Sequence, residues 1–135
     1  MAEDIESLLA AATYAVVGAS RRPEKYGHLV YLTLKAAGKI VFPVNPRADR
    51  IEGDACYPSL SALPQVPEVA VMVVPPAVTE AAVAECARLG IGGVWMQPGA
   101  ESEAAVRACH ASDIAVVSGG PCIMVLLRTH GYVRR

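Results

Sequence analysis

One short segment of the sequence combines residue types that bind anions. Gly18 follows an apolar run and opens the sequence Gly-Ala-Ser-Arg-Arg-Pro, which leads into a pattern typical of a helix. A glycine-led loop between a strand and a helix presents backbone N–H groups and a helix N-terminus to a negatively charged group. The dinucleotide fingerprint G-x-G-x-x-G is not met, because Gly18 is the only glycine of the loop. The pattern indicates an anion site, with a plain tight turn as the alternative.

A second segment of interest, Val44-Asn45-Pro46-Arg47, ends the next apolar run. An NAD-binding fold usually has Asp or Glu at this place to bind the ribose hydroxyls. Asn45 carries no charge that would repel a phosphate, and Arg47 or Arg50 could pair with a phosphate on the ribose.

The charge distribution supports a phosphorylated ligand. Residues 20–50 have a net charge of +5, whereas the whole chain has a formal charge of −1. This excess suits a polyphosphate with an additional ribose phosphate, either coenzyme A (CoA) or NADP, better than it suits NAD. A solvated helix face is an equally good interpretation for Lys35 and Lys39. The near-zero total gives no argument for binding to nucleic acid or to an anionic membrane. The basic residues of the segment are Arg21, Arg22, Lys25, Lys35, Lys39, Arg47 and Arg50.

Prolines follow the later apolar runs, in Val74-Pro75-Pro76 and Met96-Gln97-Pro98-Gly99. They end strands abruptly and stiffen the loops that follow. A rigid, largely uncharged wall of this kind suits an adenine ring or a pantetheine arm, although ordinary loop punctuation is the alternative.

Residues for catalysis or metal binding are hard to find. His28, His110 and His130 have no context that resembles a catalytic triad, so surface or packed structural histidines are the better interpretation. The four cysteines include no C-x-x-C, which argues against a zinc site. Cys122 follows the last apolar run and is expected near a ligand crevice, although a buried thiol that acts as a small hydrophobe is its simpler state. We predict no catalytic and no metal site.

Five apolar runs alternate with helical patterns, at the spacing of βαβ units. Their near-continuous apolar character fits a parallel sheet that is covered on both faces. The segment 45–68 holds four prolines and is expected to be a long loop with one short helical turn. The predicted strands are 14–17, 40–44, 69–74, 94–96 and 114–117. The predicted helices are one near 3–11, one with a stripe of Tyr26, Leu29, Val30, Thr33 and Ala37 that stops at Gly38, one with a stripe of Val78, Ala82, Cys86 and Leu89 that ends at Gly90, and one with Ala105, Val106 and Cys109 behind a Ser102 N-cap.

With 135 residues, the chain predicts one doubly wound α/β domain over 1–135, with its ligand outside the carboxyl ends of the strands. No apolar run is long enough to span a membrane, and the acidic start lacks the positive charge of a secretory signal, so a cytoplasmic location is expected. Nine Arg against three Lys, with one Asn and two Gln, is compatible with a thermophilic source.

Several motifs in order resemble the small stand-alone CoA-binding proteins, which are similar to the N-terminal CoA-binding domain of the succinyl-CoA synthetase α subunit. They lie at Tyr14–Lys25, Val41–Pro46, Ile51–Leu60, Val94–Gly99 and Gly120–Cys122. The resemblance implies a Rossmann-like domain with a five-stranded parallel sheet of order 3-2-1-4-5, helices on both faces, and CoA across the switch point.

The resemblance also implies a role for each part of the site. The loop after the first strand would hold the phosphates, the Asn45 segment the adenosine end, and the later loops the nucleotide wall and the pantetheine side. The implied CoA-binding residues are Gly18, Ala19, Ser20, Arg21, Arg22, Lys25, Tyr26, Asn45, Pro46, Arg47, Val74, Pro75, Pro76, Met96, Gln97 and Cys122.

We expect the chain to depart from the synthetases, because its 135 residues include no match to their phosphorylated-histidine domain or to their ATP-grasp partner. We therefore expect a protein that binds CoA or an acyl-CoA without catalytic groups of its own. The alternatives are an NADP-dependent oxidoreductase, a component of an acyl-CoA ligase, and a redox protein in which Cys122 forms a mixed disulfide with CoA. A homodimer is possible, but no residue pattern specifies it.

Overall fold

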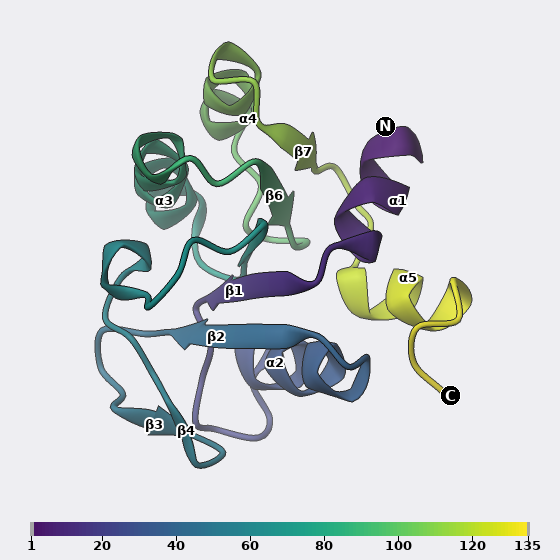
Figure 1. The fold of residues 1–135 in the computed structure, drawn as a ribbon. Helices are drawn as coiled ribbons and strands as arrows, with labels where there is room; N and C mark the ends of the chain where they lie inside the picture. The colour runs from purple at the N-terminus through teal and green to yellow at the C-terminus, as the bar shows by residue number, and fades with distance from the viewer. Residues whose placement is uncertain (1, 135) are drawn as a thin grey trace.

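A five-stranded parallel sheet is the centre of the computed structural model, which describes residues 2–134. Its strands are β1 (Thr13–Val17), β2 (Ile40–Val44), β5 (Val69–Met72), β6 (Gly93–Met96) and β7 (Ala115–Val117), and all neighbours pair in parallel. Figure 1 shows the arrowheads of β1 and β2 pointing the same way at one edge. The five strands predicted from the sequence are confirmed, and the third ends two residues earlier than expected.

The sheet has the order β2-β1-β5-β6-β7, so the chain builds outward from β1 in both directions. A parallel bridge between Val44 and Tyr57 places one further short segment outside β2. Numbered along the chain, the five strands alone have the order 2-1-3-4-5. With the Tyr57 segment counted as the third, the order becomes 3-2-1-4-5-6, which is consistent with the predicted 3-2-1-4-5 pattern. The Rossmann-like, doubly wound sheet is therefore confirmed, and its switch point lies between β1 and β5.

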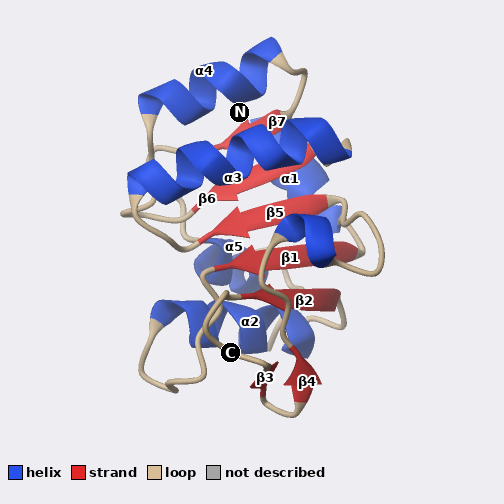
Figure 2. Ribbon diagram, turned by 90° about the vertical axis from the view of Figure 1, so that its left-hand side faces the viewer, coloured by secondary structure: helices blue, strands red, loops and turns tan. Residues whose placement is uncertain are grey.

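Helices cover both faces of the sheet, as Figure 2 shows. The helices α1 (Ala2–Ala10), α2 (Tyr26–Ala36) and α5 (Ile123–Thr129) pack on one face, and α3 (Pro76–Leu89) and α4 (Glu103–Ala111) pack on the other. Alternate residues of each strand enter opposite cores: Tyr14 and Val16 face the first group of helices, and Ala15 and Val17 the second. No helix in the described part of the chain is long and apolar enough to cross a membrane.

The helices α1 to α4 begin and end near their predicted bounds, α5 was not predicted from the sequence, and two predicted stripes are partly wrong. On α2 the side chain of Tyr26 is 68% exposed and Leu29 is also exposed, whereas Gly27, Val30 and Tyr31 are buried. Val78 on α3 is exposed as well, because that helix turns Thr79 toward the sheet. The hydrophobic pattern therefore predicted the wrong buried residues on part of both helices. Small or polar residues, Gly27 on α2 and Thr79 on α3, make part of each contact with the sheet. The predicted Ser102 N-cap is confirmed, since its hydroxyl accepts a hydrogen bond from the Ala105 amide at 3.2 Å.

The long segment after β2 contains the expected helical turn, a 3₁₀ helix at Leu60–Ala62. It also contains a hairpin that the sequence did not predict, formed by β3 (Arg50–Ile51) and β4 (Asp54–Ala55). Glu52 and Gly53 form its turn with φ values of 51° and 80°. Such turns are normally signalled by Asn-Gly or Asp-Gly, so Glu-Gly in a proline-rich segment gave no recognisable signal.

Two glycines allow the first strand, its helix and β5 to approach one another closely. A Cβ atom on Gly18 would lie 2.2 Å from the carbonyl oxygen of Val73, and Gly18 has a φ of 98°. A Cβ atom on Gly27 would lie 1.9 Å from the carbonyl oxygen of Gly18. The N-terminus of α2 can therefore reach the switch point only because neither residue has a side chain.

This close approach predicts a specific loss of stability. Gly27→Ala forces a methyl group against backbone and should lower the free energy of unfolding by about 1–3 kcal/mol or more. Gly92→Ala is the matched control, because a Cβ there meets no heavy atom of the described residues within 4 Å. Chemical denaturation of both variants measures the difference, and equal stability of the two would contradict the proposed contact.

Candidate functional site

Three cavities lie in a row along the carboxyl edge of the sheet, around the switch point. The first, of about 530 Å³, lies between the loop after β1 and the starts of α2 and α3. The second, of about 470 Å³, lies between the end of β2, the 3₁₀ helix and α3. Gly18 and Val74 line both. A small cavity of about 100 Å³, lined by Tyr26, Gln97 and Cys122, extends the row. The site therefore has the size and the position expected for a ligand of an open α/β sheet.

The loop between β1 and α2 has backbone amides without partners. Within residues 2–134, the amides of Ser20, Arg21, Tyr26 and Gly27 donate to no protein acceptor. The last two belong to the first turn of α2, where the helix dipole also favours negative charge. This loop therefore offers an anion several donors at the centre of the row of cavities.

Asn45 holds this loop from the end of β2. Its Nδ2 donates to the carbonyl of Ala19 at 2.8 Å, and its Oδ1 accepts from the amide of Arg47 at 2.8 Å. A peptide group is planar and trans, so a carbonyl held on one side turns the next N–H, that of Ser20, to the other side. Asn45 thus has a structural reason to be an amide, since a carboxylate could not donate the first bond.

The basic cluster of residues 20–50 divides into two groups. Lys35 is paired with Asp54 at 2.5 Å, Lys39 donates to the carbonyls of Leu9 and Ala11, and Arg50 donates to the Gly53 carbonyl. These three therefore stabilise the fold and do not line the cavities. Lys25 lines the first cavity. Arg21, Arg22 and Arg47 are exposed on the loops that follow β1 and β2 and line none of the three cavities, and Arg22 lies 3.4 Å from Glu24.

The wall predicted from the prolines forms around the start of α3. Pro75 is the N-cap residue and Pro76 the first residue of α3, where the missing N–H has no cost. Both line the first cavity together with Val74. Pro46 lines the second cavity beside Asn45.

Gln97 is 4% exposed and joins β6 to the start of α5. Its Oε1 accepts from the amide of Ile123 at 2.7 Å, and its Nε2 lies 3.2 Å from Cys122 Sγ. Met96 is fully buried in the core against α3 and α4, so its side chain does not face the cavities. Ala19 is also fully buried, and it takes part through its backbone carbonyl.

Two of the thiols and one of the histidines are packed inside the protein. Burial raises the pKa of Cys86 to about 12 and that of Cys109 to about 11, so both are unreactive core residues. His28 is 3% exposed and its Nδ1 lies 2.7 Å from the carbonyl oxygen of Ser20, which is the packed structural state expected from the sequence. Among the described residues, no group of three or more His, Cys, Asp or Glu could hold a metal ion.

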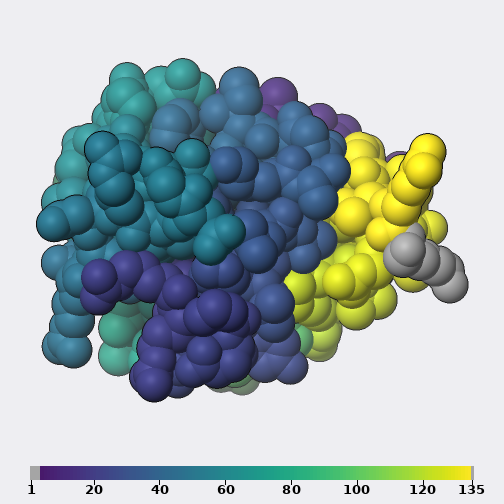
Figure 3. Space-filling view, turned by 90° about the horizontal axis from the view of Figure 1, so that it is seen from below, coloured from purple at the N-terminus to yellow at the C-terminus, as the bar shows by residue number. Residues whose placement is uncertain are grey.

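Sequence reasoning missed three contributors to this region. Gly27 lines the first cavity, and Arg88 on α3 lines the second. Gly27 lies nine positions after Gly18 and so falls outside the dinucleotide fingerprint G-x-G-x-x-G. It nevertheless allows the close packing of helix and strand for which the last glycine of that fingerprint is needed. The third is the β3–β4 hairpin, which lines none of the three cavities but contacts α2. Figure 3 shows the early part of the chain, in purple and dark blue, against the teal segment that contains it.

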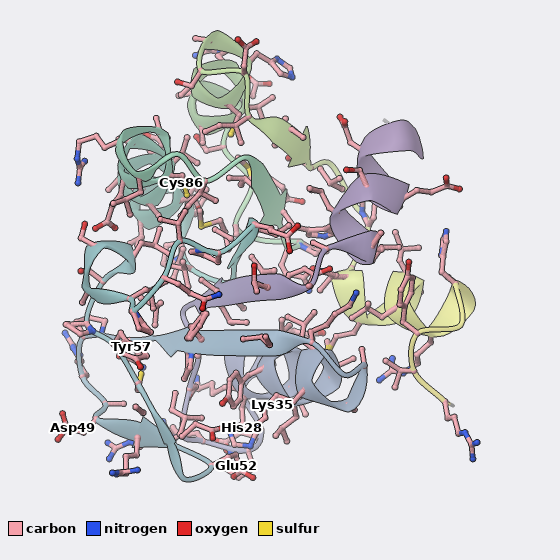
Figure 4. All side chains as sticks on the ribbon, viewed as in Figure 1. His28, Lys35, Asp49, Glu52, Tyr57 and Cys86 are labelled. Carbon is pink, nitrogen blue, oxygen red and sulfur yellow. The ribbon has the colours of Figure 1, made fainter. Side chains whose placement is uncertain are left out.

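A polar contact between Asp54 of β4 and two side chains of α2 joins the hairpin to that helix. Tyr31 and Lys35 both donate to the carboxylate of Asp54. These hydrogen bonds hold the pKa of Asp54 below its ordinary value. Figure 4 shows Lys35 on the side of α2 that faces the hairpin, while Asp49 points away from the chain.

Comparisons with known proteins agree with this geometry. A family model described as the CoA binding domain matches residues 12–128, a range that contains every motif on which the resemblance was based. The chain is 38% identical over 92 residues to acetate–CoA ligase (ADP-forming) II of Archaeoglobus fulgidus, which is 67% of this chain and only 14% of the ligase.

Two solved structures cover most of the chain. A conserved hypothetical protein from Pyrococcus furiosus has a TM-score of 0.79 and 43% identity over 84% of this chain and 97% of that one. A hypothetical protein from Pyrococcus horikoshii OT3 has a TM-score of 0.89 and 30% identity over 94% of this chain and 89% of that one.

The Asp54 contact predicts a pH-dependent contribution to stability. A carboxyl group whose pKa is lowered by folding stabilises the protein above its unfolded pKa, and this contribution is lost as the pH falls through the folded value. Asp54→Asn should therefore lower the free energy of unfolding at pH 7 by about 0.5–1 kcal/mol, because the partners are partly exposed. The difference from the unmodified protein should shrink below about pH 4. Denaturation across this pH range measures it, with the exposed Asp49→Asn as control, and a difference that is constant with pH would contradict it.

Proposed function

The chain belongs to the CoA binding domain family, coenzyme A is accordingly its ligand, and from this premise we propose that it binds CoA or an acyl-CoA along the carboxyl edge of the sheet. We further propose that it brings no catalytic groups of its own to the bound ligand.

The observation that carries the proposal is the group of unpartnered amides at the first cavity, which adjoins the second cavity at Gly18 and the small cavity at Tyr26. A diphosphate needs several donors at one place, and an extended nucleotide needs room on both sides of them. The amides of Ser20, Arg21, Tyr26 and Gly27 supply the donors, and Lys25 adds a positive charge beside them. CoA, with a diphosphate near its middle, fits this arrangement.

The two ends of CoA are assigned by the chemistry of the flanking cavities. The adenosine end belongs at the second cavity, where Asn45 and Pro46 form the wall and Arg47 lies close by on the same loop. The 3′-phosphate then pairs with Arg47. The pantetheine arm belongs along Pro75 and Pro76, with its thiol toward the small cavity of Gln97 and Cys122.

A second candidate function is that of a CoA-binding component of an acyl-CoA ligase. It is favoured by the similarity to acetate–CoA ligase (ADP-forming) II, of which the matched part is 14%. In this case the catalytic groups and the other substrates would come from a partner chain. Both functions use the same CoA site.

Calorimetric titration with CoA, dephospho-CoA, NADP and NAD tests the proposal against its rivals. We expect saturable binding of CoA, weaker binding of dephospho-CoA, and a loss of affinity with added salt, because exposed charges are screened. Tighter binding of NADP than of CoA would overturn the proposal in favour of an oxidoreductase.

The same titration tests the assignment of Arg47. Arg47→Ala should weaken CoA binding about three- to tenfold and leave dephospho-CoA almost unchanged, because the guanidinium contacts only the 3′-phosphate. Arg107→Ala, which removes the same charge from the exposed face of α4, should change neither affinity. An equal loss of affinity for CoA and dephospho-CoA in Arg47→Ala would contradict the assignment of Arg47 to the 3′-phosphate.

A further inference from the structure

His28 connects the anion-binding loop to the turn of the hairpin. A carbonyl oxygen can only accept a hydrogen bond, so Nδ1 of His28 donates to Ser20 at 2.7 Å. Its other ring nitrogen, Nε2, lies 3.6 Å from Oε2 of Glu52. Figure 4 shows His28 and Glu52 next to each other between α2 and the hairpin. The ring is buried, and the hydrogen bond to Ser20 fixes one of its nitrogens. The carboxylate of Glu52 attracts Nε2 in the protonated form of the ring, in which both nitrogens carry hydrogen.

The position of Glu52 in the turn is unusual for its residue type. Its φ of 51° is left-handed, and with Gly53 at 80° it forms a two-residue turn that favours Asn, Asp or Gly in first place. Within residues 2–134, His28 is the only polar partner of its carboxylate. A residue that breaks a local preference while making one specific contact is a candidate for a functional role.

The contact of His28 controls which way an unpartnered amide points. The carbonyl of Ser20 and the amide of Arg21 belong to one planar trans peptide group, so they point in opposite directions. Holding the carbonyl against His28 therefore turns the Arg21 amide away from the protein interior. Asn45 does the same for the preceding peptide group by holding the Ala19 carbonyl. Consecutive amides are thus aimed by two side chains from different segments.

We propose that His28 and Glu52 are positioning residues for the ligand's diphosphate: Glu52 orients the His28 ring, and the ring fixes the Ser20–Arg21 peptide with its amide toward the bound phosphate. This inference rests on the proposed CoA site and adds the hairpin turn to it. Neither side chain contacts the ligand itself.

Two neutral variants of Glu52 distinguish a positioning role from the effect of its negative charge and from its effect on the stability of the turn. Glu52→Asn suits the left-handed position better but is too short to reach the ring. Glu52→Gln removes the same charge and keeps the length, so its amide group can still contact Nε2. Loss of a negative charge near a polyanion alone would tighten binding in both variants. If Glu52 is a positioning residue, Glu52→Asn weakens CoA binding about five- to tenfold, the equivalent of one hydrogen bond, whereas Glu52→Gln retains most of the affinity.

Hydrogen exchange without ligand provides an independent readout. The peptide that covers residues 18–27 should exchange faster in Glu52→Asn than in Glu52→Gln, while the thermal midpoint of Glu52→Asn is unchanged or higher. Equal exchange in both variants, or CoA binding by Glu52→Asn that is as tight as in the unmodified protein, would overturn the inference. Failure of the unmodified protein to bind CoA would instead overturn the proposed function, and the exchange experiment would still decide the role of His28.

Discussion

The close packing of three backbone segments at the switch point is the constraint on which the rest of the site depends. The end of β1 lies against the carbonyl of Val73, and the start of α2 lies against the carbonyl of Gly18. Both contacts exclude a Cβ atom, so glycine is required on steric grounds. Because the contacts are this short, the first turn of α2 opens directly onto the first cavity, and Gly18 lines both the first and the second. The proposed anion site is thus a consequence of how closely backbone can approach backbone.

The elements that could be predicted from the sequence are those with a strong local pattern. The five strands are apolar and β-branched, and Ser102 and Gly90 mark helix ends by well-understood chemistry. The hairpin could not be predicted, because its strands have two residues each and their contacts with the rest of the protein, such as Asp54 with Tyr31, join residues far apart in the sequence. The buried face of α2 was misjudged for a related reason. Gly27 belongs to it through close approach, which no hydrophobicity scale records.

The same holds for the candidate site: its segments could be predicted from local sequence motifs, but the partners of its charged side chains could not. The sequence predicted the segments of the crevice, and the structure places Gly18, Ser20, Lys25, Asn45 and Gln97 along one row of cavities. The net positive charge of residues 20–50 was a weaker guide, because the pattern does not reveal which charges have partners inside the protein. Lys39 shows this clearly, since its ammonium group contacts two carbonyls and the rings of Tyr14 and Tyr132.

The two held carbonyls of the loop after β1 also affect the entropy of binding. Asn45 and His28 restrict the Ala19 and Ser20 peptide groups in the absence of any ligand. The loop therefore loses its conformational freedom when the chain folds, and little remains to be lost when an anion arrives. An anion meets donors that are already aimed, so more of the free energy of its hydrogen bonds is retained as affinity. A backbone site made in this way can bind a phosphate firmly without a deep pocket around it.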